Sequence, residues 1–146
     1  MACAGGRRIS YLHAVSACQF PTQAGWTFRR EEFLLRLLRG AASGPGVPWV
    51  AHVDDGAHCL HISFHEGNAS EIALPVREII LDAAAHGSSG LILAHNHPSG
   101  EPTPSDSDCR ATRRLAAAAE ALDCAVLDHL VFGGGECASF RRLGLL

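Results

Sequence analysis

The sequence predicts an α+β fold in which one β-sheet is flanked by helices. Some stretches alternate apolar and polar residues or are continuously apolar, as strands do, while others repeat apolar residues at helical spacing. In order they give a helix, a hairpin, a helix, a strand, a helix and a second hairpin, which is typical of α+β domains. A length of 146 residues fits one domain, placed over residues 25–146, and 47% hydrophobic residues exclude a wholly disordered chain.

The N-terminal half is predicted to hold a tail, a helix and a hairpin. Residues 1–24 are weakly periodic and are expected to form a tail or one short added element. Residues 28–39 carry an apolar stripe at helical spacing, and a loop rich in glycine and proline follows over 40–48. Strands are predicted over 49–53 and 59–65, and alternation in the second predicts a half-buried strand paired with the first.

The C-terminal half is predicted to hold two helices and three strands. A proline opens the first of these helices and a glycine ends it, in the usual order. The strand that follows is short and continuously apolar, which suits a central strand buried on both faces. The elements are a helix over 75–86 capped by Gly87, a strand over 90–94, a helix from Ser105 to about Leu122, and strands over 125–132 and 136–140 joined by a glycine turn.

Composition and charge narrow the classes of function. A net charge of −3 provides no basic field that would attract nucleic acid. No apolar run reaches the roughly 18 residues of a membrane-spanning helix, and no secretory signal follows the first residues, so a cytoplasmic protein is expected. The six cysteines form no C-x-x-C pair, which excludes a zinc ribbon and predicts free structural thiols.

The candidate chemistry is concentrated in residues 95–108. His95 and His97 lie two apart at the end of the buried strand, so strand periodicity places both imidazoles on one face. Asp108 lies in the first turn of the next helix, where its carboxylate can be the third ligand. Three protein ligands with an open fourth position are typical of a catalytic zinc ion. Ser105 begins the same helix, where its hydroxyl and backbone N–H can donate to a developing oxyanion.

Ser105 and Asp108 also have a purely local interpretation. Their spacing is that of a capping box, which would stabilise the start of the helix without any metal. The histidine pair favours metal binding for the group as a whole, because it is followed by a proline-rich loop that brings the chain back to a carboxylate.

This pattern resembles the JAMM motif of JAB/MPN-domain metalloproteases, in which His-x-His is followed, after seven intervening residues, by Ser and then, after two more, by Asp. The resemblance spans roughly residues 45–146 and is strongest to the RadC-like bacterial branch. It implies a twisted sheet between helices, with a cytidine-deaminase-like layout. It also implies one zinc ion held by His95, His97 and Asp108, with Ser105 polarising the scissile carbonyl. The matching segments are LPVRE at 74–78, LILAHNHPSGEPTPS at 91–105, LDHL at 127–130, SFR at 139–141 and GLL at 144–146.

The activity implied by the resemblance is hydrolysis of an amide or isopeptide bond in a protein or peptide by zinc-activated water. The family's general base is a glutamate, and the matching position falls near Gly46, where the chain has no acid. The nearest upstream acids, Glu31 and Glu32, and Glu66 at the far end of the hairpin are weak candidates for that role. The alternative function is a weakly active or inactive JAB-like binding module, which the family name alone links to DNA repair. The sequence predicts neither the substrate nor the oligomeric state.

Other histidines and one acid remain to be assigned. Asp128 and His129 lie on a strand that the resemblance puts beside the site, so one of them would orient a ligand imidazole. Strand packing is the equal alternative for both. Four further histidines are numerous enough for a second metal site, although solvent-facing side chains are the favoured interpretation. They are His52, His58, His61 and His65.

Overall fold

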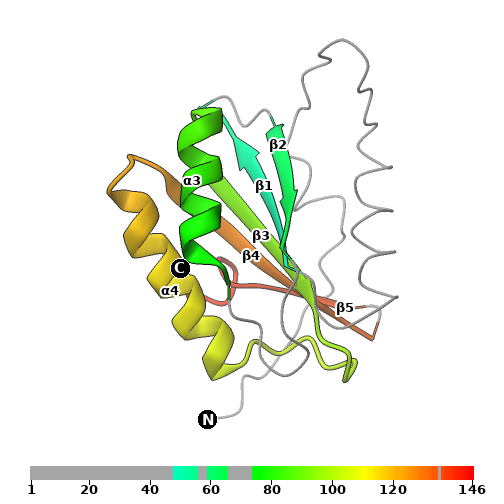
Figure 1. Ribbon diagram of the computed structural model, residues 1–146. Helices are drawn as coiled ribbons and strands as arrows, with labels where there is room; N and C mark the ends of the chain where they lie inside the picture. Colours follow the sequence, from blue (N-terminus) through cyan, green and yellow to red (C-terminus); the bar gives the residue numbers. More distant parts are fainter. Residues whose placement is uncertain (1–47, 56–58, 66–73, 135) are drawn as a thin grey trace, which may run out of the picture.

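The computed structural model describes residues 48–55, 59–65, 74–134 and 136–146. The predicted tail over 1–24, the predicted helix over 28–39 and most of the predicted loop over 40–48 lie outside this part. Figure 1 shows that the described residues form an α+β fold, as the sequence predicts. Its elements are β1 (Trp49–Val53), β2 (Cys59–Phe64), α3 (Val76–His86), β3 (Gly90–Asn96), α4 (Asp106–Glu120), β4 (Ala125–Gly133) and β5 (Glu136–Ser139).

The strands form one mixed sheet in the order β2-β1-β3-β4-β5. β1 pairs antiparallel with both β2 and β3, so the predicted first hairpin is confirmed. β4 and β5 form the second predicted hairpin. β3 and β4 pair in parallel, and α4 makes the crossover connection that a parallel pair requires. β3 therefore lies at the centre of the sheet, where its continuous apolar run is expected.

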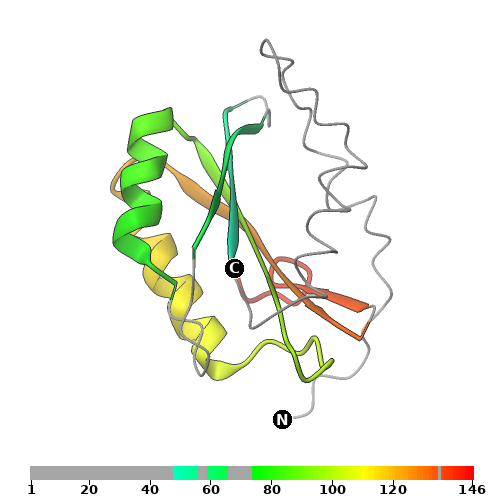
Figure 2. The same ribbon diagram turned by 45° about the vertical axis from the view of Figure 1, so that its right-hand side comes forward.

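Both helices cover the same face of the sheet (Figures 1 and 2). Strand alternation divides the apolar residues between the two faces. Leu91 and Leu93 of β3 pack in the core cluster beneath the helices, with Ile79 of α3 and Leu115 of α4. Ala94 belongs to a smaller cluster with residues of β1 and β4. Odd-numbered side chains of β3 thus face the helices, and this parity positions the site described below.

The helix ends agree closely with the turn chemistry in the sequence. α3 ends at Gly87, which adopts φ +62°, a left-handed conformation that suits glycine. The backbone N–H groups of Gly87 and Ser88 donate to carbonyl groups of the last turn. Ser105 is the N-cap of α4, which ends at Glu120, slightly before the predicted end, and the chain then turns through Asp123 at φ +53°.

One expectation about the histidines is wrong. His52 of β1 is fully buried rather than solvent-facing, and its two ring nitrogens lie 3.1 Å from Ser88 Oγ and 3.2 Å from Ser63 Oγ. Burial, with a smaller contribution from the neighbouring His61, lowers the pKa of His52 to about 4. The cause is the strand order: β1 lies between β2 and β3 and its even-numbered residues face the helix layer. His61 and His65 are half-buried, and His58 lies outside the described residues.

The predictions about membrane-spanning segments and about cysteines can be compared with the described part of the chain. Neither helix there is both long enough and apolar enough to cross a membrane. Cys109, Cys124 and Cys137 there are free thiols, as predicted, and burial raises the pKa of the Cys137 thiol to about 12. Such a thiol is protonated and therefore a poor nucleophile.

Candidate metal centre

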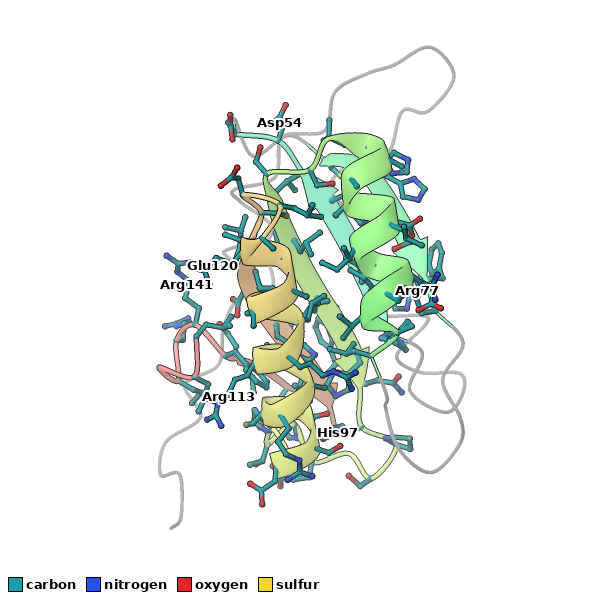
Figure 3. All side chains as sticks on the ribbon, turned by 60° about the vertical axis from the view of Figure 1, so that its left-hand side comes forward. Asp54, Arg77, His97, Arg113, Glu120 and Arg141 are labelled. Carbon is teal, nitrogen blue, oxygen red and sulfur yellow. The ribbon has the colours of Figure 1, made fainter. Side chains whose placement is uncertain are left out.

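Two histidines lie at the carboxyl end of β3, the central strand. His95 is buried and shares its parity with Leu93, so it faces the side of the sheet that the helices cover. His97 follows the strand, and its backbone N–H donates to the carbonyl of Phe132 at 2.7 Å, which extends the pairing with β4. Figure 3 shows His97 beside the start of α4, at the opposite end of the sheet from Asp54. Both imidazoles therefore meet the N-terminal turn of α4.

The loop after β3 fixes the imidazole of His97. Its Nδ1 lies 2.8 Å from the backbone carbonyl oxygen of Glu101. A carbonyl oxygen can only accept, so Nδ1 carries the proton in the neutral imidazole and Nε2 keeps its lone pair. The unprotonated nitrogen faces His95 and Asp108, which is the orientation that a metal ligand needs.

Asp108 contributes to the helix cap and to the histidine group with the same carboxylate. Its Oδ2 accepts a hydrogen bond from the Ser105 N–H at 2.8 Å, and its own N–H donates to Ser105 Oγ at 3.1 Å. Oδ2 also lies 3.1 Å from His97 Nε2, and Oδ1 lies 3.3 Å from His95 Nε2. The capping box and the ligand role are therefore compatible, although the sequence poses them as alternatives.

The candidate ligand atoms lie close enough together to share one metal ion. Ligand atoms bound at about 2.0 Å to a tetrahedral ion lie roughly 3.3 Å from one another. The two Nε2 atoms are 3.1 Å apart; His97 Nε2 lies 3.1 Å from Oδ2 of Asp108, and His95 Nε2 lies 3.3 Å from Oδ1 of the same carboxylate. Two imidazole lone pairs and a carboxylate converge there, an arrangement that a cation among them would stabilise. His95, His97 and Asp108 could thus hold a metal ion, as predicted.

Burial and hydrogen bonding set the charge of the carboxylate. Asp108 is only 3% exposed, and burial by itself would raise its pKa. The contact with His95 and the hydrogen bond from the Ser105 N–H outweigh burial, so the pKa of Asp108 lies well below its usual value. The side chain is therefore an anion at neutral pH, which is the form that binds a cation.

A second layer of polar contacts lies behind His95. His95 Nδ1 is 2.7 Å from Nε2 of His129 on β4, and His129 Nδ1 is 2.6 Å from Oγ1 of Thr112 on α4. The His129 ring stacks on Phe140 at a centroid distance of 4.7 Å, and burial lowers its pKa to about 3. Sequence reasoning did not identify Thr112. Its position four residues after Asp108, on the same face of a helix, is the signal that points to it.

Asp128 and His129, which the sequence leaves undecided, have different roles. The Asp128 carboxylate accepts hydrogen bonds from the hydroxyl of Ser139 at 2.6 Å and from the backbone N–H of Arg141 at 3.1 Å. It therefore joins β4 to β5 and to the residues just after β5, which is the packing role. His129 contacts the candidate ligand His95 directly, which is the orienting role.

The candidates for the general base lie outside the described residues. This holds for the position near Gly46 and for the acids Glu31, Glu32 and Glu66. Within the described residues, one group of at least three potential ligands is close enough to hold a metal, and it consists of His95, His97 and Asp108. The strand histidines discussed above do not form a second group of that kind in this part of the chain.

Comparison with known proteins places this geometry in a family. The chain matches the family model described as the RadC-like JAB domain over residues 31–145. The chain belongs to the RadC-like JAB domain family. The matched range contains all three candidate metal ligands together with His129 and Thr112, and the α+β sheet is consistent with the JAB-like fold that the resemblance implied.

Two curated relatives, both described as UPF0758 proteins, support this membership. One, from Pelobacter propionicus, is 36% identical over 120 residues, which cover 81% of this chain and 45% of the relative. The other, from Chloroflexus aggregans, is 42% identical over 79 residues, which cover 54% of this chain and 34% of the relative. In both comparisons the match spans less than half the length of the relative.

Proposed function

We propose that the RadC-like JAB domain of this chain is a zinc-dependent hydrolase of the JAMM type. The bond it cleaves is an amide or isopeptide bond in a protein or peptide. The observation that carries the proposal is the convergence of two imidazole nitrogens, 3.1 Å apart, on one carboxylate whose two oxygens lie 3.1 and 3.3 Å from them, a donor set that suits a zinc site with three protein ligands. A set of three leaves a fourth position for water, as in catalytic sites.

Each residue of the group would have a defined task. His95, His97 and Asp108 would hold zinc, which when bound supplies a Lewis acid and acidifies a water molecule. The Ser105 N–H is bonded to Asp108, so the serine would act through its hydroxyl. The hydroxyl oxygen accepts from the Asp108 N–H, which leaves the hydroxyl proton to be donated to the oxygen of the scissile carbonyl.

The first experiment measures zinc per chain in purified, tag-free protein by mass spectrometry. The wild type should hold one zinc, and the double variant His95→Ala/His97→Ala and the single variant Asp108→Asn should hold far less. Asp106→Asn is the matched control, because Asp106 is an exposed acid in the same first turn of α4 that lies outside the metal-binding group. Full zinc in the double histidine variant would contradict the site, as would zinc loss in the Asp106 variant.

Activity separates hydrolysis from binding alone. Peptide and isopeptide substrates should be cleaved by the wild type and by Asp106→Asn, and chelation or Asp108→Asn should abolish cleavage. Cleavage that survives the Asp108 substitution would come from another site or from a contaminating peptidase, and would contradict the proposal.

A binding module is the second candidate, and one observation favours it. The position that the resemblance assigns to the general-base glutamate falls near Gly46, where the sequence has no acid. One zinc per chain without hydrolysis of any peptide or isopeptide substrate would support this second candidate over the first.

A further inference from the structure

We propose that Thr112 is a positioning residue, which sets the metal-binding tautomer of His95 through His129. The proposal rests on the metal site proposed above and extends it to two side chains that touch no metal. The three side chains come from three elements, Thr112 from α4, His129 from β4 and His95 from β3. They are linked by hydrogen bonds whose directions can be assigned one after another.

The direction is fixed at the helix. Thr112 Oγ1 lies 2.7 Å from the backbone carbonyl oxygen of Asp108, one turn earlier in α4. A carbonyl oxygen can only accept, so the single hydroxyl proton of Thr112 lies in this hydrogen bond. Toward any other partner, Thr112 Oγ1 can only accept.

That assignment fixes the tautomer of His129. Its Nδ1 lies 2.6 Å from Thr112 Oγ1, so Nδ1 must be the donor and carries the proton. The imidazole is 1% exposed and packs against Phe140, an environment that favours the neutral ring. In the neutral ring Nε2 then has a lone pair and acts as an acceptor.

The same logic fixes His95. Its Nδ1 lies 2.7 Å from the acceptor His129 Nε2, so His95 Nδ1 must donate. The lone pair of His95 is therefore on Nε2, the atom that lies near His97 Nε2 and the Asp108 carboxylate. The opposite tautomer of His95 would set two lone pairs against each other at 2.7 Å in a buried place, which is unfavourable.

The two candidate ligands reach the same tautomer by different routes. His97 is half-buried and uses one step, a hydrogen bond from Nδ1 to the Glu101 carbonyl oxygen. His95 reaches a carbonyl oxygen only through His129 and Thr112, and that carbonyl belongs to Asp108, the third candidate ligand. His129 and Thr112, together called the relay below, therefore link the orientation of the candidate ligand His95 to the backbone of the candidate ligand Asp108. His95, His129 and Thr112 are at most 2% exposed, so solvent does not compete for these bonds.

The first test reads the tautomers by nitrogen-15 NMR of the imidazole rings, on the full chain stripped of metal with a chelator. In the wild type, His95 and His129 should both carry the proton on Nδ1. A His95 that carries its proton on Nε2 and not on Nδ1 in the wild type would overturn the proposal, whatever the variants do.

Substitution then separates the relay from simple packing. Thr112→Val removes the hydroxyl at similar volume, and Thr112→Ser keeps it. In Thr112→Val we expect mixed tautomers at His129 and His95 and roughly tenfold weaker binding of added zinc, the low end of the loss seen when the partner of a metal-binding histidine is removed. In Thr112→Ser both properties should return to those of the wild type.

The outcomes keep this proposal distinct from the metal site itself. A Thr112→Val protein that is less stable but keeps the wild-type tautomers and zinc affinity would make Thr112 a packing residue and overturn the relay. A wild type that binds no zinc would overturn the proposed function. The tautomer measurement would then still decide whether Thr112 orients His95, because it is made without metal.

Discussion

At the scale of single residues, Asp108 joins the start of α4 to the metal-binding group. Its Oδ2 accepts from the Ser105 N–H at 2.8 Å and faces His97 Nε2 at 3.1 Å. A cation would draw on an oxygen that the helix cap already orients, so the ligand needs little reorganisation to bind. Folding of the helix start thus prepares the site.

Ser105 can be tested for its two roles separately. Ser105→Ala should lower the free energy of unfolding by about 1 kcal/mol through loss of the cap, whereas Ser105→Gly should cost only a few tenths of a kcal/mol. Both lack the hydroxyl, so both should lower kcat about 100-fold if that group stabilises the oxyanion. Chemical denaturation and hydrolysis assays provide the two readouts, and zinc content should not change. A Gly variant with wild-type kcat would remove Ser105 from the reaction.

The buried His52 predicts loss of stability in acid. Its pKa is about 4 in the folded chain against 6.5 for an unperturbed histidine, so the unfolded chain binds more protons between these values. The contribution of His52 to the free energy of unfolding is fully present above about pH 6.5. It falls by about 2 to 3 kcal/mol as the pH drops toward 4. Urea unfolding between pH 7.5 and 4.5 should show this fall.

The matched variant for that measurement is His52→Gln, which retains a side chain able to hydrogen-bond Ser63 and Ser88. Its stability profile should be shallower over the same pH range. It should not become flat, because the pKa of His129 is also lowered, to about 3. A variant profile as steep as that of the wild type would contradict the assignment to His52.

At the scale of elements, the end of β4 packs against the loop that follows β3, whose Glu101 carbonyl contacts His97. A Cβ added at Gly133 would lie 2.8 Å from the backbone carbon of Gly100 and 2.9 Å from that of Glu101. Backbone atoms cannot rotate away, so any side chain at 133 would move the loop. The moved segment includes the Glu101 carbonyl that fixes His97.

Gly133→Ala should therefore weaken zinc binding about tenfold, as loss of an orienting partner does, together with a loss of stability. Gly87→Ala is the control, because a Cβ there meets nothing within 4 Å and the cost is backbone strain at φ +62°. That strain is worth about 1–2 kcal/mol and lies far from the loop, at the end of α3. Titration calorimetry with zinc on both variants would decide, and equal affinities would contradict the proposed coupling.

The elements themselves were predictable wherever the signal is local. Gly87 ends α3, the alternation over 59–65 marks β2, and the continuous apolar run after Gly90 marks the central strand. The orientation of His52 was not predictable, because it depends on which strands flank β1 and on which face the helices cover. Such information resides in the packing of distant segments and leaves no local pattern.

At the scale of the whole molecule, metal binding should stabilise the fold. The candidate ligands come from β3, the loop after it and α4, so a metal ion joins segments that unfolding separates. Zinc at 100 times its Kd should add about 2.7 kcal/mol to the free energy of unfolding, which a thermal melt detects as a rise in Tm. Chelator should reverse the rise. The Asp108→Asn variant should show none, and the Asp106→Asn control should show the full shift.

The candidate site was predictable in its ligands but not in its support. His95, His97 and Asp108 lie within one short stretch whose spacing itself indicates metal binding. The supporting role of Thr112 was not predictable, because its partner His129 lies 17 residues further along the chain. His129 is on a strand whose pairing with β3 the sequence does not specify. Supporting contacts of this kind arise from the parallel pairing of β3 and β4, a long-range property.

The parallel pairing of β3 and β4 also bears on the order of folding. A parallel pair cannot close by a tight turn, so β4 reaches β3 only across the long connection that contains α4, which is a slow kind of contact to make. Until then the nascent chain carries His95 on β3 and His97 just after it without His129 behind them. A short peptide cut from residues 90–105 would likewise display the His-x-His signature without the acid, the relay or the cap. Selective metal capture would thus be a late event in the maturation of this chain, coincident with closure of the crossover.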